Sequence, residues 1–165
     1  MFSKRPSTTA AVVVSVIVAW GPVGVVLKAQ RPSVVTPAPP LSAHDVLVAM
    51  NASRVHDGLT PLVMDARLTA AARDKMADML RRHYFDHKSP DGKSIWDTIP
   101  PDKCAYGVAG ENLARGFSDP AAMETSWMHS ASHRENILNR DHKLTGIAVS
   151  QSPPMAVVLF ADTCG

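Results

Sequence analysis

The stretch WMHSASHRENILN, residues 127–139, decides how this sequence is interpreted. It holds two histidines four residues apart, His129 and His133, and a pair with this spacing on one helix face can clamp a metal ion. His83 and His87 have the same spacing, but His87 lies beside a Ser-Pro-Asp-Gly turn, with only Lys88 between them. Because the helix should end before that turn, we do not expect either spacing by itself to form a metal clamp.

A different grouping brings more chemistry together. His87, Glu111 and His133 each lie where a segment ends or turns, so all three can point into one cleft. Two imidazoles and a carboxylate could hold Zn²⁺ with open positions, or act as a general acid/base set. They could equally form a hydrogen-bonded buried cluster that only holds the fold together. Among the remaining histidines, His44, His56 and His142 are expected to be solvated residues at the surface.

Three segments show helical patterns with start and stop signals. Ser42 should begin the first helix, with Asp45 completing a capping box, and Gly58 should end it. Asp65 should cap the second helix, whose apolar stripe is formed by Leu68, Ala71, Ala72, Met76, Met79 and Leu80. Ser118 or Asp119 should cap the third, with Pro120 in its first turn. The segment SIWDTIPP, residues 94–101, is predicted as one short helix with Trp96 in the core.

Two β-strands close the sequence. LTGIAVSQ (residues 144–151) and MAVVLFADT (155–163) are rich in β-branched and apolar residues, with the hairpin loop Ser-Pro-Pro between them. AYGVAGENLARG (residues 105–116) has some β character. Helices first and a strand pair last predict an α+β fold, a layered α-β-α domain with a small antiparallel sheet.

The N-terminal region has the composition of an export signal. Lys4 and Arg5 precede an apolar run from Ala10 to Leu27, and residues 30–40 form a proline-rich linker. Residues 1–29 are therefore predicted to be a signal peptide, or a membrane anchor if they are not cleaved. From Leu41 onward acidic residues outnumber Lys and Arg, so we expect no nucleic-acid surface.

The chain has two cysteines, Cys104 and Cys164. In an exported protein they should form a disulfide, which would tie the C-terminus to the middle of the domain. Two free buried thiols are the alternative.

Four motifs give the sequence a family resemblance. YFDHKSPDGKSIWDTI, GENLARG, WMHSASHRENILN and GIAVS occur in the order and at about the spacing of bacterial members of the CAP superfamily. This superfamily, also called SCP-like, is named for cysteine-rich secretory proteins, antigen 5 and pathogenesis-related 1. The resemblance covers residues 41–165 and implies an α-β-α sandwich, export, and a cleft with two histidines and one or two acidic residues.

Carried over residue by residue, the resemblance implies that His87, Glu111 and His133 form the cleft. Ser130 occupies the position where many eukaryotic members have a second Glu. Residues expected to support the cleft are Asn112, Trp127, Ser130, Arg134 and Asn136, with Arg134 supporting the local fold or pairing with an acid. No catalytic residue is assigned.

Three functions remain open on these grounds. The first is a binding module for a lipid-type or sterol-type ligand or a divalent metal such as zinc, with no required cofactor. The second is a metal-assisted or acid/base hydrolase of peptides or cell-wall polymers. The third is a structural module that meets a cell-envelope component. We expect a monomer that is secreted or held at the cell envelope.

Overall fold

The computed structural model describes residues 40–99 and 104–164. The helices are α1 (Ala43–His56), α2 (Ala66–Arg82), α3 (Pro120–His129) and α4 (Ala131–Leu138). The strands are β1 (Val63–Met64), β2 (Ala109–Arg115), β3 (Leu144–Gln151) and β4 (Pro154–Ala161). The predicted leader and linker, residues 1–29 and 30–40, lie outside this described part, except for Pro40. No helix within the described part is long and apolar enough to cross a membrane.

The helix starts follow the capping residues of the sequence. The Ser42 hydroxyl oxygen accepts from the Asp45 amide at 3.1 Å, which confirms the cap of α1. Asp65 accepts from the Leu68 amide at 3.1 Å at the start of α2. Of the two candidates for α3, Asp119 is the cap. These side chains satisfy amides that have no partner within the first turn of each helix.

The sheet has four strands in the order β1-β3-β4-β2. β4 lies antiparallel to both β2 and β3, as the sequence predicted for β3 and β4. β1 runs parallel to β3, so the sheet is mixed rather than purely antiparallel. Two residues are too few to show a strand pattern, and for that reason the sequence did not predict β1.

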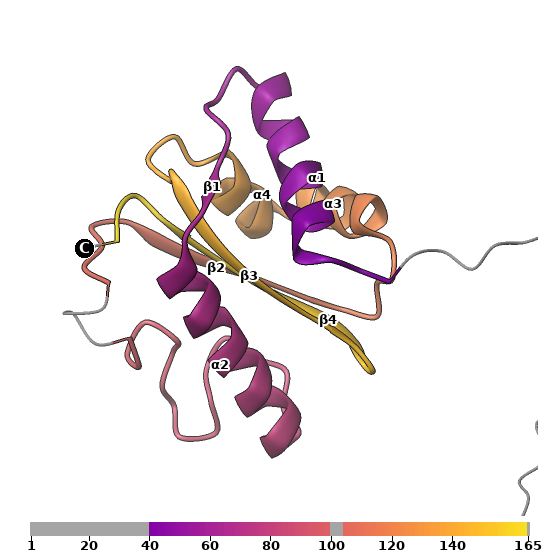
Figure 1. Cartoon of the computed structure of the whole chain (residues 1–165), viewed down its shortest axis with the longest axis vertical. Helices are drawn as coiled ribbons and strands as arrows, with labels where there is room; N and C mark the ends of the chain where they lie inside the picture. The colour runs from indigo at the N-terminus through magenta and orange to yellow at the C-terminus, as the bar shows by residue number, and fades with distance from the viewer. Residues whose placement is uncertain (1–39, 100–103, 165) are drawn as a thin grey trace, which may run out of the picture. The chain divides into compact units, whose positions relative to one another are not determined.

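Helices cover both faces of the sheet and make three layers (Figure 1). α1, α3 and α4 lie on one face, and α2 lies on the other. Side chains of β4 alternate between the two cores: Val158 and Phe160 pack with Trp127 on the first face, and Val157 and Leu159 pack with α2 on the second. The α-β-α sandwich is thus confirmed.

Gly146 of β3 allows α2 to approach the sheet closely. A Cβ atom at this position would overlap the main chain of Leu68 and Thr69. Since α2 carries residues that frame the site described below, this close contact sets the height of the helix above the sheet.

The segment from Ser94 to Ile99 departs from the predicted helix. It forms turns and bends, and Ile95 is its most buried residue while Trp96 is half-buried. Asp97 accepts from the Ser94 amide at 2.8 Å, and the Ser94 hydroxyl oxygen accepts from the Asp97 amide at 3.3 Å, which is the reciprocal pattern of a helix start. A single turn follows, closed by the bond from the Thr98 amide to the Ile95 oxygen at 2.9 Å. Residues 100–101 of the predicted helix lie outside the described residues.

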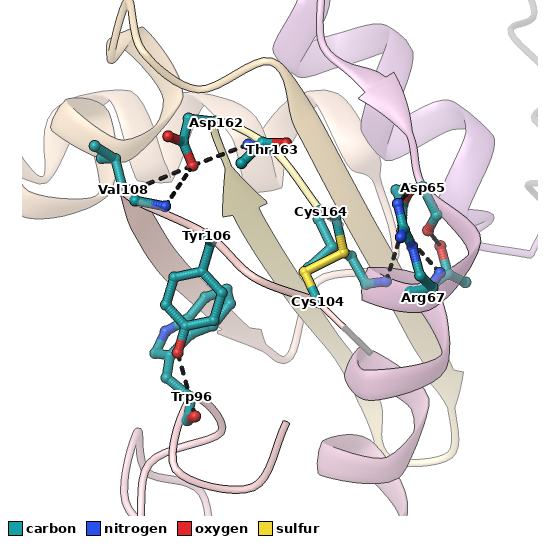
Figure 2. The surroundings of a disulfide bond; sticks show 12 residues. Asp65, Arg67, Trp96, Cys104, Tyr106, Val108, Asp162, Thr163 and Cys164 are labelled. Carbon is teal, nitrogen blue, oxygen red and sulfur yellow. Dashed lines mark hydrogen bonds and ion pairs between the residues drawn. A yellow bond between two sulfur atoms is a disulfide. The ribbon is translucent and has the colours of Figure 1, made fainter. Parts of the chain in front are cut away.

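The disulfide Cys104–Cys164 joins the C-terminal segment to the chain just before β2 (Figure 2). Next to it, the Asp162 carboxylate accepts from the amides of Gly107 at 2.9 Å and Val108 at 3.1 Å. The predicted pairing of the cysteines is confirmed, and both sulfur atoms lie in a buried cluster with Leu68.

Candidate functional site

The centre of the site is a hydrogen bond between His87 and Glu111. His87 follows α2 in an irregular segment, and Glu111 is the third residue of β2. Their Nδ1 and Oε1 atoms are 2.6 Å apart. The His87 side chain is 57% exposed, whereas the Glu111 side chain is 5% exposed. A buried carboxylate therefore fixes the orientation of an accessible imidazole.

Opposing influences act on the pKa of the Glu111 carboxyl. Its burial raises its pKa, and the hydrogen bond from His87 and the charge of Lys75 act in the opposite direction. Its second oxygen, Oε2, is buried and has no hydrogen-bond partner among the described residues. An unpartnered buried carboxylate oxygen is costly for stability, and such costs are typical of sites kept for binding or chemistry.

Lys75 lies directly behind this pair. It belongs to the buried face of α2, and its ammonium group donates to the main-chain oxygen of His87 at 2.9 Å. Burial lowers its pKa, while the nearby Glu111 charge raises it. Lys75 was not predicted to belong to the site, although a lysine on the apolar stripe of α2, between Ala72 and Met79, is a detectable signal.

His133 lies on α4 and is half-buried. Burial lowers its pKa, and the charge of His87 acts in the same direction. Its main-chain oxygen accepts from the Asn112 side chain at 3.0 Å, and Asn136 donates to the Asn112 side chain at 2.9 Å. These two asparagines join α4 to β2 and thereby fix His133 relative to Glu111.

The remaining predicted residues surround this framework. Trp127 is buried and its indole donates to the Leu113 oxygen at 3.1 Å. Ser130 separates α3 from α4, and its side chain makes no capping hydrogen bond. Arg134 is exposed and has no ion pair within the described residues. His129 is exposed and donates to the Thr125 oxygen at 2.7 Å, away from the His87 pair.

The histidine spacings do not create metal clamps. α2 ends at Arg82, before His83 and His87, and the break at Ser130 places His129 and His133 on different helices. In the described ranges, no three His, Cys, Asp or Glu side chains are grouped so that they could hold one metal ion. With Glu111 Oε1 bonded to His87 Nδ1, the predicted side chains are not arranged as a three-ligand metal centre in this part of the chain.

Comparison with known proteins assigns the family. Residues 47–160 match the sequence model of the cysteine-rich secretory protein family, CAP. The chain belongs to the CAP family. This CAP domain resembles a crystal structure of an extracellular protein containing an SCP domain from Bacillus anthracis, with 26% identity and a TM-score of 0.64. That likeness covers 75% of this chain and 45% of the other.

Two proteins of Bacillus subtilis (strain 168) are similar to this CAP domain in sequence. The uncharacterized protein YkwD is 38% identical over 127 residues, which cover 75% of this chain and 49% of YkwD. The uncharacterized membrane protein YlbC is 33% identical over 111 residues, which cover 67% of this chain and 32% of YlbC. The chain therefore spans about half of the first relative and about a third of the second.

Two further buried polar residues of the CAP domain lie outside the predicted site. His142 was expected to be solvated, but it is 1% exposed, stacked on Phe160, and donates from Nδ1 to the Asn136 oxygen at 2.9 Å. The expectation for His142 is therefore wrong. Arg54 is also 1% exposed and binds main-chain oxygens only. His44 and His56 are exposed, as expected.

Two adjoining cavities lie between α2 and the 94–99 segment. They measure about 190 and 220 Å³ and have mostly apolar walls. Asp74, Ile95 and Thr98 line both of them, and Lys75 lines the first. Lys75 also donates to the main-chain oxygen of His87, so this residue links the first cavity to the polar pair, whereas neither His87 nor Glu111 lines either of the two cavities.

Proposed function

We propose that this chain is an exported CAP domain that binds a small lipid-type or sterol-type ligand at the His87–Glu111 pair. The observation that carries the proposal is the 2.6 Å bond between a buried carboxylate and an exposed imidazole. The bond occupies Nδ1 and leaves Nε2 of His87 free to meet a ligand. A side chain that is oriented before the ligand arrives loses little entropy on binding.

The neighbouring cavities support an amphipathic ligand. Ligand sites are concave, mostly apolar, and carry a few polar groups that fix orientation. Here the apolar walls come from Ile95, Ile99 and alanines of α2. Lys75 lines the first cavity, and its ammonium group also donates to the main-chain oxygen of His87. The apolar part of the ligand would lie along α2 and its polar end would face His87.

Export follows from the basic and apolar leader and from the disulfide. Disulfides persist in oxidising compartments, and the Cys104–Cys164 bond fits that environment. One similar protein is described as extracellular and another as a membrane protein. We therefore place the domain outside the cell or at the envelope, where a cell-envelope component could also be its partner.

An acid/base hydrolase is the second candidate. A histidine oriented by a buried carboxylate is the arrangement that general acid/base catalysis requires, and His87 with Glu111 has it. The Ser130 hydroxyl has no hydrogen-bond partner among the described residues, so no activated serine is assigned. Release of fragments from peptides or cell-wall polymers, abolished by Glu111→Gln, would favour this candidate over binding alone.

The proposed function is tested by calorimetry on the full chain. The probes are 1-dodecanol and dodecanoate, two single-chain amphiphiles, and Zn²⁺ in a separate titration. We expect saturable binding of an amphiphile that His87→Ala weakens at least about tenfold, the value of one good hydrogen bond. His129→Ala, which removes an exposed histidine outside the pair, is the matched control and should bind as the unchanged chain does.

Two results would contradict the proposal. One is the absence of saturable amphiphile binding, and the other is binding that His87→Ala leaves unchanged. Tight Zn²⁺ binding lost in both His87→Ala and His133→Ala would instead establish a metal site that side-chain rearrangement creates.

A further inference from the structure

We propose that Lys75 is a positioning residue for His87. Its ammonium group holds the His87 main chain and balances the Glu111 carboxylate, so that the His87 ring presents an unprotonated Nε2 to the ligand. The ligand group that meets this atom is then a hydrogen-bond donor, such as a hydroxyl. The part of this inference that concerns the ligand rests on the proposed function, whereas the part that concerns Lys75 does not.

The surroundings of Lys75 are unusual for a lysine. The residue is 4% exposed, and its Nζ atom lies 2.9 Å from the His87 oxygen and 5.1 Å from the centre of the Tyr84 ring. A buried ammonium is costly unless other groups compensate its lost hydration. A carbonyl oxygen and an aromatic face do so in part. A negative charge must compensate the rest of the hydration that the Lys75 ammonium group loses on burial.

Glu111 is the buried negative charge next to Lys75. The charged groups that act on Lys75 are Glu111, Asp78 and Asp86, and those that act on Glu111 are Lys75, His87 and Asp86. Asp78 is bound to Arg81, Arg82 and Tyr84, and Asp86 is exposed and accepts from the Lys88 amide. Lys75 and Glu111 are therefore the buried members of this group of charges, and each offsets the cost of burying the other.

The position of the proton follows from this balance. An ionised carboxylate can only accept, so the proton between Glu111 and His87 belongs to Nδ1. A neutral imidazole carries one proton, and its Nε2 then has a free lone pair. A second proton on the pair would neutralise its net charge of −1 and so remove the negative charge that offsets Lys75, which opposes that protonation. Lys75 thus favours the singly protonated form of the pair.

This arrangement selects the ligand by its polar group. A hydroxyl can donate to the lone pair of Nε2. A carboxylate has no proton to donate, and its lone pairs would face that of Nε2. The inference therefore separates two amphiphiles of equal chain length that differ only in their polar ends.

The role of Lys75 is tested by nuclear magnetic resonance on the labelled full chain. The readouts are the Glu111 carboxyl carbon and the His87 ring nitrogens, followed against pH. In Lys75→Met we expect the midpoint of the Glu111 titration to rise by about one pH unit, because an opposite charge has been removed. Lys75→Arg should restore the titration. Lys93→Met removes an exposed lysine that lines the same cavity, and it should leave the midpoint unchanged.

An unchanged midpoint of the Glu111 titration in Lys75→Met would show that Lys75 only fills space in the interior, and would overturn the inference. If that variant does not fold, the His87 ring nitrogen signals of the unchanged chain still test the inference. A His87 ring with Nε2 protonated and Nδ1 unprotonated at neutral pH would overturn the inference, and the opposite tautomer would support it.

The ligand class is tested by comparing 1-dodecanol with dodecanoate on the unchanged chain. We expect the alcohol to bind about tenfold more tightly, as one extra hydrogen bond allows. Tighter binding of dodecanoate would overturn the donor preference. Binding of neither probe would reject the proposed function and the ligand preference with it, while the Glu111 titration would still decide the role of Lys75.

Discussion

Arg54 of α1 donates from its guanidinium group to the main-chain oxygen of Ile137, 83 residues further along the chain. The same side chain also reaches the oxygens of Thr60, Asn139 and His142, at 2.9 Å in each case. One buried cation therefore satisfies the carbonyls at the end of α4 and after it. It fixes the C-terminal end of the helix that carries His133.

Replacing Arg54 should be among the most destabilising single changes. Arg54→Met keeps much of the volume but leaves buried carbonyls unpaired, so we expect a loss of about 3–5 kcal/mol in the free energy of unfolding. Arg54→Lys should recover only part of this loss, because an ammonium group cannot reproduce the guanidinium geometry. Urea unfolding measures both variants. A loss below about 1 kcal/mol in Arg54→Met would contradict this role.

His142 should make the stability of the domain sensitive to mild acid. Burial lowers the pKa of its imidazole, and the nearby Arg54 charge acts in the same direction. Below about pH 6.5 the unfolded chain takes up a proton that the folded chain resists, so the free energy of unfolding should fall as the pH falls. Burial also lowers the pKa of His133, which adds to this slope.

The contribution of His142 can be isolated by comparison of two variants. His142→Gln should show a smaller decrease in stability between pH 7 and pH 5 than the unchanged chain, whatever its stability at pH 7. His44→Gln, which changes an exposed histidine, should retain the full decrease. Chemical unfolding at several pH values gives the comparison, and an equal slope in all three proteins would exclude His142 as a cause.

The disulfide should stabilise the domain by restricting the unfolded chain. Cys104 and Cys164 are 60 residues apart in the sequence, and closing a loop of that length is worth about 4 kcal/mol in the chain-entropy description. The double change to serine should therefore lower the free energy of unfolding by about that amount. Thermal unfolding of the variant, next to the chemically reduced protein, measures it. Equal stability with and without the bond would contradict the prediction.

Gly146 should tolerate no side chain. Gly146→Ala must push α2 away from β3, because the new Cβ would overlap the main chain of Leu68. We expect a loss of more than about 3 kcal/mol, and weaker amphiphile binding because Lys75 moves with α2. Ser150→Ala on the same strand is the control and should change little. Unfolding curves and calorimetry together report both effects, and a fully stable Gly146→Ala protein would refute the close contact.

Capping residues and hydrophobic periodicity predicted most of the fold. Ser42, Asp65 and Asp119 each form a hydrogen bond with a residue two or three positions away. Neighbouring residues in the sequence are therefore enough to predict where each helix begins. β1 could not be predicted, because it exists only through pairing with β3 some eighty residues later. The turns at 94–99 were mistaken for a helix because Ser94 and Asp97 form the reciprocal bonds of a helix start, but only one turn follows them.

The candidate site was predicted less completely than the fold. The sequence grouped His87 with Glu111, and the structure shows them hydrogen-bonded. Lys75 and Arg54 were overlooked, although both interrupt apolar helix stripes, which is a usable signal for a buried polar role. The burial of His142 depends on Phe160 and Asn136, which come together only in the folded domain.

The central claim is that His87 meets the ligand through its free ring nitrogen. The most direct measurement follows the ring nitrogens of the labelled full chain by nuclear magnetic resonance during titration with 1-dodecanol. We predict that the Nε2 signal of His87 moves and saturates, while the signals of His129 stay in place. Saturable binding that leaves the His87 ring signals unchanged would show that the ligand binds elsewhere and would contradict the account.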